Sequence, residues 1–226
     1  MSWLTGSGER AVVADFSSGS DRLALVTPDG LAAIPGLGNP VGHSPALASD
    51  GRLAFADQQP GKSGPQFRLR MFDPASTKTT TLLTLTTPPS NLAWGPDGQL
   101  ALIADTGSDG AHLLVLDVAD AKARRVADLP REAVSVLWAS WGGFVVVLSS
   151  GGDPTTAHAV VLNASGKQVA EVAREWRPLG LMDDGALIAA NASGELFRLA
   201  APTYDVSESF GSSAFTGTDA IWQVVT

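Results

Sequence analysis

The chain has 226 residues, of which 44% are hydrophobic and 17% charged, so it can bury a core and is not disordered. Its net charge is −8 and its basic residues gather only in pairs, which disfavours a nucleic-acid partner. It has no cysteine, which excludes disulfides and thiolate metal sites. No apolar run has the length of a membrane span, and the N-terminus lacks the basic and apolar regions of a signal peptide. These features leave a cytoplasmic protein or an extracytoplasmic domain lacking its leader, and we favour the second.

One pattern recurs along the chain: a turn residue followed by a strand that opens with apolar residues. Copies begin at Asp21, Gly51, Gly98, Gly143, Gly185 and Asp219. The four central copies are 47, 45 and 42 residues apart, whereas the first and last copies are weaker and lie 30 and 34 residues away from their neighbours. A period in the low-to-mid forties is typical of one four-stranded blade of a β-propeller.

The third copy shows the strands of one repeat most clearly. Strands are predicted at residues 91–94, 99–105, 112–117 and 122–129, with a Pro-Asp-Gly turn before the second. The fourth copy repeats this order at residues 134–140, 144–149, 158–163 and 168–172. Residues 119–134 also contain good helix formers, but the repeat register favours an outer strand there.

We therefore predict an all-β fold, a single β-propeller domain over residues 1–226. Six copies of the pattern predict six blades, and a five-bladed ring is the alternative. The last copy ends after its second strand. We expect an N-terminal strand at residues 2–5 to complete the last blade, because such closure removes an open sheet edge.

Residues 92–101 (Leu-Ala-Trp-Gly-Pro-Asp-Gly-Gln-Leu-Ala) resemble the WD40-like repeat of TolB-type propellers. In that family a Trp-x-Pro-Asp-Gly turn precedes an apolar strand, and a later strand ends in Asp, as at Asp73 and Asp117. The usage of Ala, Val, Leu and Gly, with little Lys, is also similar to that of actinobacterial proteins and of the propeller domain of LpqB-type envelope lipoproteins. These resemblances imply a propeller associated with the cell envelope and assign no functional residue.

Two short motifs resemble catalytic loops but lack required parts. Residues 42–46 (Gly-His-Ser-Pro-Ala) match most of a nucleophile elbow, yet the last glycine is replaced by Ala46 and a strand is expected to follow. Residues 61–63 (Gly-Lys-Ser) match the end of a phosphate loop, but Gly64 and Pro65 preclude the helix that should face the phosphate. We interpret both as ordinary loops and predict no catalytic residue and no cofactor.

Two groups of residues resemble metal sites. Asp105 and Asp109 have calcium-loop spacing, but the position of the bidentate glutamate is occupied by Leu116. We interpret this segment as a turn, with a loose calcium site as the alternative. His112 and His158 occupy equivalent positions in neighbouring repeats, and two imidazoles without a third ligand make a poor zinc site. No metal site is predicted.

Binding is expected on the propeller face that carries the loops between second and third strands and the connections between blades, because binding sites are usually built from loops on a rigid scaffold. Long loops are predicted at residues 57–66, 105–111 and 150–157. The candidate binding residues on this face are Trp176, Arg177, Arg174, Arg131, Asp109, His112 and His158. Trp176 and its neighbouring arginines form the best anchor, since Trp and Arg dominate interface hot spots. Packing of Trp176 between blades is the equal alternative.

Three functions remain open. We favour a monomeric, non-catalytic scaffold that binds another protein at the cell envelope. The second is a ligand-binding or lactonase-like hydrolytic propeller, disfavoured because the predicted innermost strands at residues 92–94, 134–139 and 179–182 carry no acidic residue. The third is an accessory domain of a larger enzyme.

Overall fold

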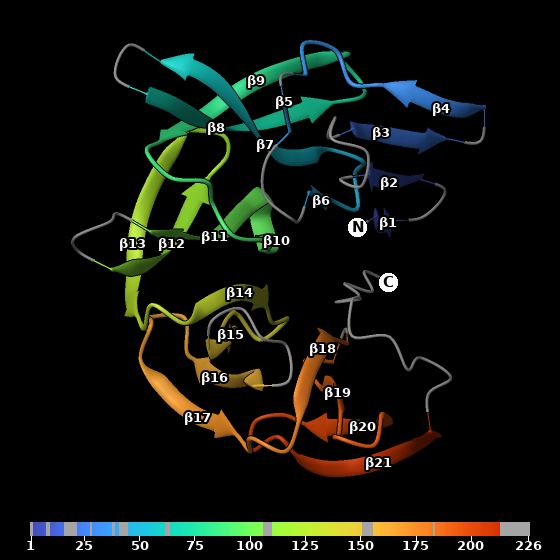
Figure 1. The fold of residues 1–226 in the computed structure, drawn as a ribbon, viewed down its shortest axis with the longest axis vertical. Coiled ribbons are helices and arrows are strands. Elements are labelled where there is room, and N and C mark those ends of the chain that lie inside the picture. Colours follow the sequence, from blue (N-terminus) through green and yellow to red (C-terminus); the bar gives the residue numbers. More distant parts are fainter. Residues whose placement is uncertain are drawn as a thin grey trace.

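The computed structural model describes residues 2–7, 10–15, 22–27, 29–37, 39–40, 45–61, 64–105, 110–150, 156–182 and 184–212. Regular structure in these ranges is almost entirely β-strand, and the strands form five antiparallel sheets arranged around a common centre (Figure 1). The predicted all-β propeller fold is therefore confirmed. No described helix is long and apolar enough to cross a membrane.

Each sheet is built from strands that follow one another in the chain. The first contains β1 (Ser2–Ser7), β2 (Arg10–Asp15), β3 (Arg22–Thr27) and β4 (Gly30–Ala33). The second contains β5 (Asn39–Pro40), β6 (Ala46–Leu47), β7 (Leu53–Gly61), β8 (Gly64–Asp73) and β9 (Lys78–Leu85), with β5 and β6 both paired to β7. The third contains β10 (Leu92–Trp94), β11 (Gln99–Asp105), β12 (Ala111–Asp117) and β13 (Lys122–Leu129), with the 3-10 turn η1 (Pro96–Gly98) after β10.

The last two described sheets have the same order. The fourth contains β14 (Ala133–Trp138), β15 (Phe144–Leu148), β16 (His158–Leu162) and β17 (Gln168–Val172). The fifth contains β18 (Arg177–Leu181), β19 (Leu187–Ala190), β20 (Glu195–Ala200) and β21 (Asp205–Ser212). The first strands β1, β6, β10, β14 and β18 lie nearest the middle of the ring (Figure 1).

The hydrophobic core lies in layers between neighbouring sheets. Four clusters of buried side chains are described, and each combines residues of two consecutive sheets, as Leu113 and Val146 do for the third and fourth. All five side chains of β15 are buried. A strand covered on both faces carries a continuous apolar run instead of an alternating one, which explains the Phe-Val-Val-Val-Leu sequence of β15.

Because the strands of a blade are antiparallel and consecutive, their connections fall on two opposite faces of the ring. We call the face with the turns between first and second and between third and fourth strands the turn face. The face with the loops between second and third strands and the connections between sheets is the loop face. Those candidate binding residues predicted from sequence that the structure describes belong to the loop face.

The repeat register is confirmed for the four central copies. Strands β7, β11, β15 and β19 each begin within two residues of Gly51, Gly98, Gly143 and Gly185. The Pro-Asp-Gly turn is present as η1, with Asp97 at φ 58° and Gly98 at φ 72°. Strand β13 confirms the outer strand that the register favoured over a helix.

The first copy was placed wrongly. Arg22, which follows Asp21, begins β3, the third strand of its sheet, whereas the second strand β2 begins at Arg10. The second strands of the five sheets begin at residues 10, 53, 99, 144 and 187, which are 43, 46, 45 and 43 residues apart. The short spacing of 30 residues before Gly51 was therefore the sign that the copy at Asp21 was out of phase.

The N-terminal strand also differs from the prediction. Ser2–Ser7 pairs with β2, with Trp3 opposite Ala14, and is the first strand of the first sheet. It takes this place because β2 is its immediate neighbour in the chain, so that the two form a hairpin. The sixth copy at Asp219 lies outside the described residues, and the predicted count of six blades stays a prediction.

A buried asparagine joins the inner strands of the third and fourth sheets. Asn91 is 9% exposed, and its Nδ2 donates to the carbonyl oxygen of Val136 at 2.7 Å. Its Oδ1 accepts from the backbone N–H of Val136, also at 2.7 Å. One side chain therefore satisfies both backbone polar groups of Val136, in the manner of a strand partner.

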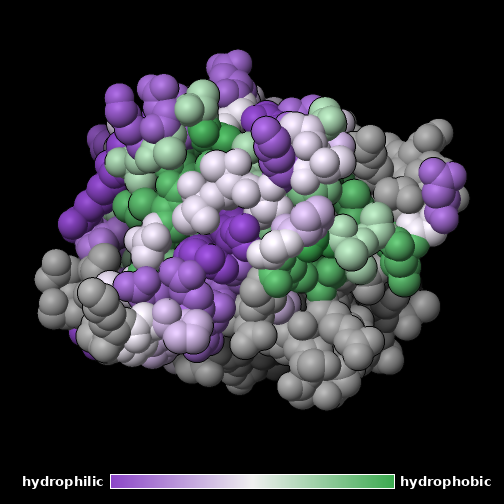
Figure 2. Space-filling view, turned by 90° about the horizontal axis from the view of Figure 1, so that it is seen from above, coloured by the Kyte–Doolittle hydropathy of each residue, from purple (hydrophilic) through white to green (hydrophobic). Residues whose placement is uncertain are grey.

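The outer rim of the molecule mixes polar and apolar side chains. Figure 2, which looks onto the side that carries the second sheet, shows hydrophilic residues interspersed with small hydrophobic patches. Scattered apolar residues are ordinary on protein surfaces and need no special function.

Replacing Asn91 tests this junction. Asn91→Leu keeps the approximate size but leaves both polar groups of Val136 without a partner, so the free energy of unfolding is expected to fall by about 2–4 kcal/mol. Urea denaturation followed by circular dichroism measures the change. Glu132→Gln, at an exposed position in a nearby connection, serves as the control and is expected to stay within about 0.5 kcal/mol. Equal effects of the two variants would contradict the assigned role.

Candidate functional site

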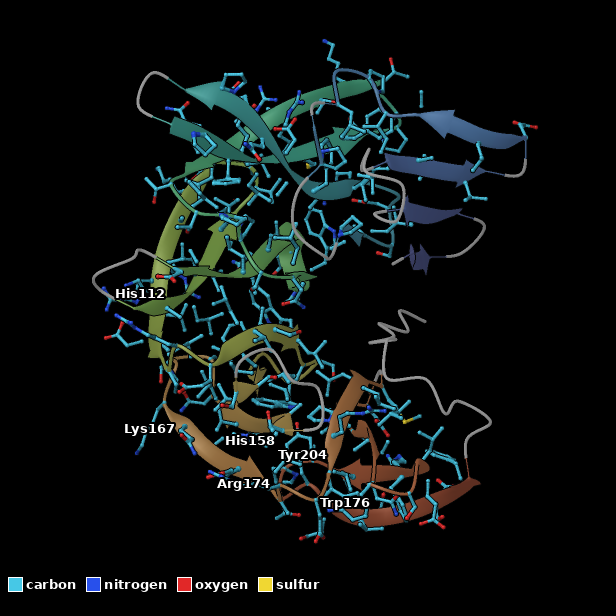
Figure 3. All side chains as sticks on the ribbon, viewed as in Figure 1. His112, His158, Lys167, Arg174, Trp176 and Tyr204 are labelled. Carbon is cyan, nitrogen blue, oxygen red and sulfur yellow. The ribbon has the colours of Figure 1, made fainter. Side chains whose placement is uncertain are left out.

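The predicted anchor on the loop face is partly used in packing. The rings of Trp176 and Phe197 lie 4.6 Å apart between centroids at an angle of 59°, and Trp176 packs against the cluster between the fourth and fifth sheets. Arg174 is exposed, with its Nε 3.9 Å from Glu171 Oε1, and Arg177 is half-buried at the start of β18. Figure 3 shows Arg174 and Trp176 near the junction of these sheets. The packing alternative for Trp176 is supported, and its replacement would disturb the core as well as the surface.

The two histidines lie at the beginnings of equivalent third strands, as predicted. His112 is 3% exposed and its Nδ1 lies 3.1 Å from Asp128 Oδ1, whereas His158 is half-buried. The hydrogen bond and charge of Arg125 hold the pKa of Asp128 below its ordinary value, with a smaller contribution from His112. The histidines lie in separate sheets (Figure 3), and the described residues include no group of three His, Asp or Glu side chains placed to bind a metal.

The remaining loop-face predictions have mixed outcomes. Arg131 is exposed in the connection after β13. Asp109 lies outside the described residues, as do residues 42–44 and 62–63 of the two motifs that resemble catalytic loops. The predicted loop at residues 57–66 is wrong, because β7 and β8 continue pairing to Gly61 and Gly64 as one long hairpin.

Buried charges tie this hairpin together. Asp57 is fully buried, and Arg68 donates to it through Nε and Nη2, both at 2.7 Å. Arg70 Nη1 donates to Asp57 at 2.8 Å and also to the carbonyl oxygen of Gly36. A buried carboxylate is tolerated only when it is paired in this way. From the sequence, Arg68 and Arg70 were recognised only as a pair of basic residues. Asp57, which faces them if residues 57–70 form a hairpin, was the feature that could have predicted this network.

The turn face carries a row of three tryptophans, Trp94, Trp138 and Trp141, which we call the aromatic seam. The sequence analysis did not predict it. Trp94, at the end of β10, donates its Nε1–H to the carbonyl oxygen of Ala46 in the second sheet at 2.9 Å. Trp138, at the equivalent end of β14, lies on Gly95, where a Cβ would overlap its indole ring. The tryptophans at the ends of first strands therefore connect the second sheet to the third and the third to the fourth. Trp94 and Trp138 occupy equivalent positions in their repeats, and this equivalence was the feature of the sequence that could have predicted the seam.

The seam continues to the fifth sheet through Trp141. A Cβ at Gly185 would lie 2.7 Å from Trp141 Cδ1, and Gly185 has φ 79°, so both space and backbone conformation favour glycine there. The hydroxyl of Tyr204 donates a hydrogen bond to the carbonyl oxygen of Gly185 in this turn, at 3.3 Å. Burial raises the pKa of Tyr204, and a hydrogen bond with Trp141 partly opposes that rise.

Part of the seam remains exposed. Trp141 is 41% exposed, and Met182, the first residue of the turn that contains Gly185, is 37% exposed. We call these two residues the Trp141–Met182 patch. Their backbone is held by turn hydrogen bonds, from Gly142 N–H to Ala139 and from Gly185 N–H to Met182, both at 2.9 Å. Both residues are thus apolar and exposed, and each belongs to a turn that a backbone hydrogen bond closes.

A groove opens on the same face between the second and third sheets. Its volume is about 470 Å³, and it is lined by residues 47–50, Arg52 and residues 94–98. The Arg52 guanidinium carbon lies 5.2 Å from the Trp94 ring centroid, and Arg52 Nε donates to Asp50 Oδ2 at 2.7 Å. The arginine is therefore held between an aromatic ring and a carboxylate.

The turns of this face carry an excess of negative charge. In the described parts of the second to fifth sheets, these turns and the strand ends beside them contain seven aspartates and four cationic residues. These are Asp50, Asp73, Asp97, Asp117, Asp120, Asp184 and Asp205, with Arg52, Lys78, Lys122 and Lys167.

Some of these aspartates close turns, but the charge is not needed for that role. Asp117 Oδ1 accepts from the N–H of Ala119 at 3.0 Å, and the neutral Asn163 in the equivalent turn accepts from the N–H of Ser165 at 3.1 Å. An amide can therefore close such a turn in place of a carboxylate, and turn formation alone does not explain the excess of negative charge on this face.

Gly95→Ala tests the seam. The added methyl group overlaps the Trp138 ring and is expected to lower the free energy of unfolding by about 1–3 kcal/mol. The φ of Gly95 is −116°, which alanine adopts without strain, so the loss reports on the indole contact. Urea denaturation measures it, with Ser49→Ala in the groove wall as the control. If Gly95→Ala lowers the free energy of unfolding no more than Ser49→Ala does, the packing of Trp138 on Gly95 does not contribute to stability as proposed.

Acidification tests the turn aspartates. The Ser76 hydroxyl and the Ala75 N–H bond to Asp73 and hold its pKa below the ordinary value of 3.8. Ionised Asp73 therefore stabilises the fold above pH 3.8, and this contribution is lost as the pH falls through the lower pKa of the folded state. When the free energy of unfolding is measured against pH, the curves of the wild type and Asp73→Asn should diverge above pH 3.8 and converge as the pH falls below the pKa of Asp73 in the folded state. Parallel curves would contradict the assignment.

Comparison with known proteins places the fold. No family model and no curated protein matches this sequence. The structure is similar to TolB from Acinetobacter baumannii, with a TM-score of 0.65 and 13% identity over 90% of this chain and 53% of TolB. This chain therefore spans about half the length of the TolB chain that it matches.

Two further structures have comparable scores. The β-propeller domain of the Trilobed protease from Pyrococcus furiosus has a TM-score of 0.61 and 16% identity, over 93% of this chain and 71% of the other. Puromycin hydrolase has a TM-score of 0.60 and 16% identity, over 95% of this chain and 40% of the other. At these identities the likeness concerns the fold alone: the chain is a β-propeller with an architecture similar to that of TolB.

Proposed function

We propose that this chain is a non-catalytic β-propeller that binds another protein through its turn face. The observation that carries the proposal is the exposed Trp141–Met182 patch. Trp and Met are enriched in protein interfaces, and Trp is prominent among hot-spot residues. A surface on fixed turns also loses little conformational freedom when a partner binds.

Structural packing accounts for only part of Trp141. Its contacts with Gly185 and Tyr204 explain why one side of the indole is covered. They do not require a side chain of this size to leave 41% of its surface exposed. The described contacts give the Met182 side chain no packing role, and its exposure at the start of the turn on which Trp141 lies favours a binding role.

The predicted loop-face residues form a second candidate surface. Arg174 and Arg131 are exposed, so the charged part of that prediction remains available for binding. Trp176 is the weaker anchor because it packs on Phe197. We place the protein at the cell envelope, as the resemblance of its repeat implies.

An accessory domain of a larger enzyme is the alternative function. It is favoured by the match to the propeller domain of a protease and to a part of puromycin hydrolase. The neighbouring coding sequence separates the alternatives: a hydrolase domain in the same reading frame would favour the accessory role, and a lipobox cysteine behind a signal peptide would favour the envelope scaffold.

Site-specific cross-linking tests the proposed surface. A photoreactive phenylalanine analogue at position 141 or 182 is expected to capture one partner from the native cells, whereas the same group at Val169 on an outer strand is not. With that partner purified, Met182→Ser and Trp141→Ala are each expected to raise the Kd by at least about tenfold. Val169→Ala, at a residue 56% exposed, should leave the Kd unchanged.

Unfolding midpoints of the variants separate lost contact from lost folding, because Met182→Ser removes no described packing contact. Capture only from position 169, together with an unchanged Kd for Met182→Ser, would move the site away from the turn face.

A further inference from the structure

The groove between the second and third sheets is large enough to hold a small ligand or a side chain. Its volume of about 470 Å³ falls within the range of sites that hold small ligands. One wall is the turn at residues 48–52, and the other is the Pro-Asp-Gly turn of the third sheet. Both walls are tight turns, so the groove is formed by backbone that hydrogen bonds hold, including Gly51 N–H to Ala48 at 2.9 Å and Gly95 N–H to Gln99 at 2.9 Å.

The charges at the groove favour a cation. Among the described residues that line it, two are acidic, Asp50 and Asp97, and Arg52 alone is basic. Arg52 pairs with Asp50, and its charge also contributes to the lowered pKa of Asp73, after the hydrogen bonds of Ser76 and Ala75. One guanidinium thus interacts with two carboxylates, of which Asp50 alone is ion-paired with it, and the described lining residues carry a net negative charge.

A cation of the chain itself already occupies part of the groove. The guanidinium of Arg52 lies over the Trp94 ring, in a cation–π arrangement, while its Nε donates to Asp50. The Asp50 side chain is 52% exposed and Asp97 is exposed at the tip of its turn, so both carboxylates are accessible to a second cation.

The groove is linked to the Trp141–Met182 patch by the packing contacts of the seam. Gly95, which lines the groove, lies under the Trp138 ring. Trp138 and Trp141 belong to the same short segment, and Trp141 lies on the turn that begins at Met182. The patch and the groove therefore lie on the same face, on consecutive sheets that the seam connects, and a bound protein that covers the patch can extend over the seam to the groove.

We propose that this groove receives a lysine or arginine side chain of the protein that binds the turn face. The inference rests on the proposed function and adds the chemistry of the partner: a basic residue for the groove and apolar residues for the patch. Charge complementarity selects the basic residue, and continuity along the seam favours a protein side chain over a free small cation.

The test uses the full-length chain labelled with ¹⁵N and two blocked pentapeptides, Gly-Ser-Arg-Ser-Gly and the same peptide with citrulline, which has the shape of arginine without its charge. The test variant is Asp50→Asn with Asp97→Asn. Asparagine tolerates the φ of 58° at position 97 and keeps the acceptor oxygen at position 50, so the turns are expected to persist. Asp120→Asn, on an exposed turn of the same face, is the matched control.

The arginine peptide is expected to shift the indole N–H of Trp94 and the amides of Gly51 and Gly98, and to bind at least about fivefold more tightly than the citrulline peptide. The double variant should weaken binding by at least about threefold, and Asp120→Asn should have a smaller effect. Equal binding of both peptides, shifts confined to other sheets, an unaffected double variant or no binding at millimolar concentration would each overturn the inference.

The outcomes distinguish this inference from the proposed function. Cross-links at positions 141 and 182 together with a failed peptide titration would leave the turn face as the binding surface and remove the cation pocket. Loss of the cross-links themselves would remove the proposed function whatever the peptides do.

Discussion

The structure depends on the contact between neighbouring sheets. A single four-stranded blade exposes both of its faces, and each described core cluster is completed only by the next sheet along the chain. Asn91 adds a polar junction to this apolar packing, because its amide pairs with both backbone groups of Val136 in the next inner strand. Stability therefore accumulates from one blade to the next, as in other repeat architectures.

The same contacts determine which face offers a surface for binding. On the turn face, Trp94, Trp138 and Trp141 connect four consecutive sheets and leave part of one indole exposed. Within the second sheet, by contrast, Arg68 and Arg70 are paired with the buried Asp57. Interior ion pairs of this kind stabilise a hairpin, whereas an exposed aromatic residue on a fixed turn remains available to a partner.

Local sequence was a good guide where the repeat was regular. The Gly-initiated strands at residues 51, 98, 143 and 185 were recognised because a tight turn and an apolar strand have a strong local signature. The first copy was misplaced because Asp21 precedes a similar apolar strand in a different position of the sheet. The hairpin at residues 57–66 was missed because its glycines and prolines suggested a loop. The ion pairs that stabilise it join Asp57 to arginines 11 and 13 residues later, so they become visible only once the two strands are paired.

The sequence by itself determined the all-β class, the repeat period, the strands of the central blades and the positions of their turns, since these follow from residue spacing and turn chemistry. Only the tertiary structure decided which side chains meet across blades. Trp138 on Gly95 and Trp141 on Gly185 join residues about 43 positions apart, one repeat period, and the groove at Arg52 and Trp94 spans a similar separation. Contacts of this kind depend on how one sheet rotates against the next, which no local pattern encodes, so the candidate surface emerged only from the packed ring.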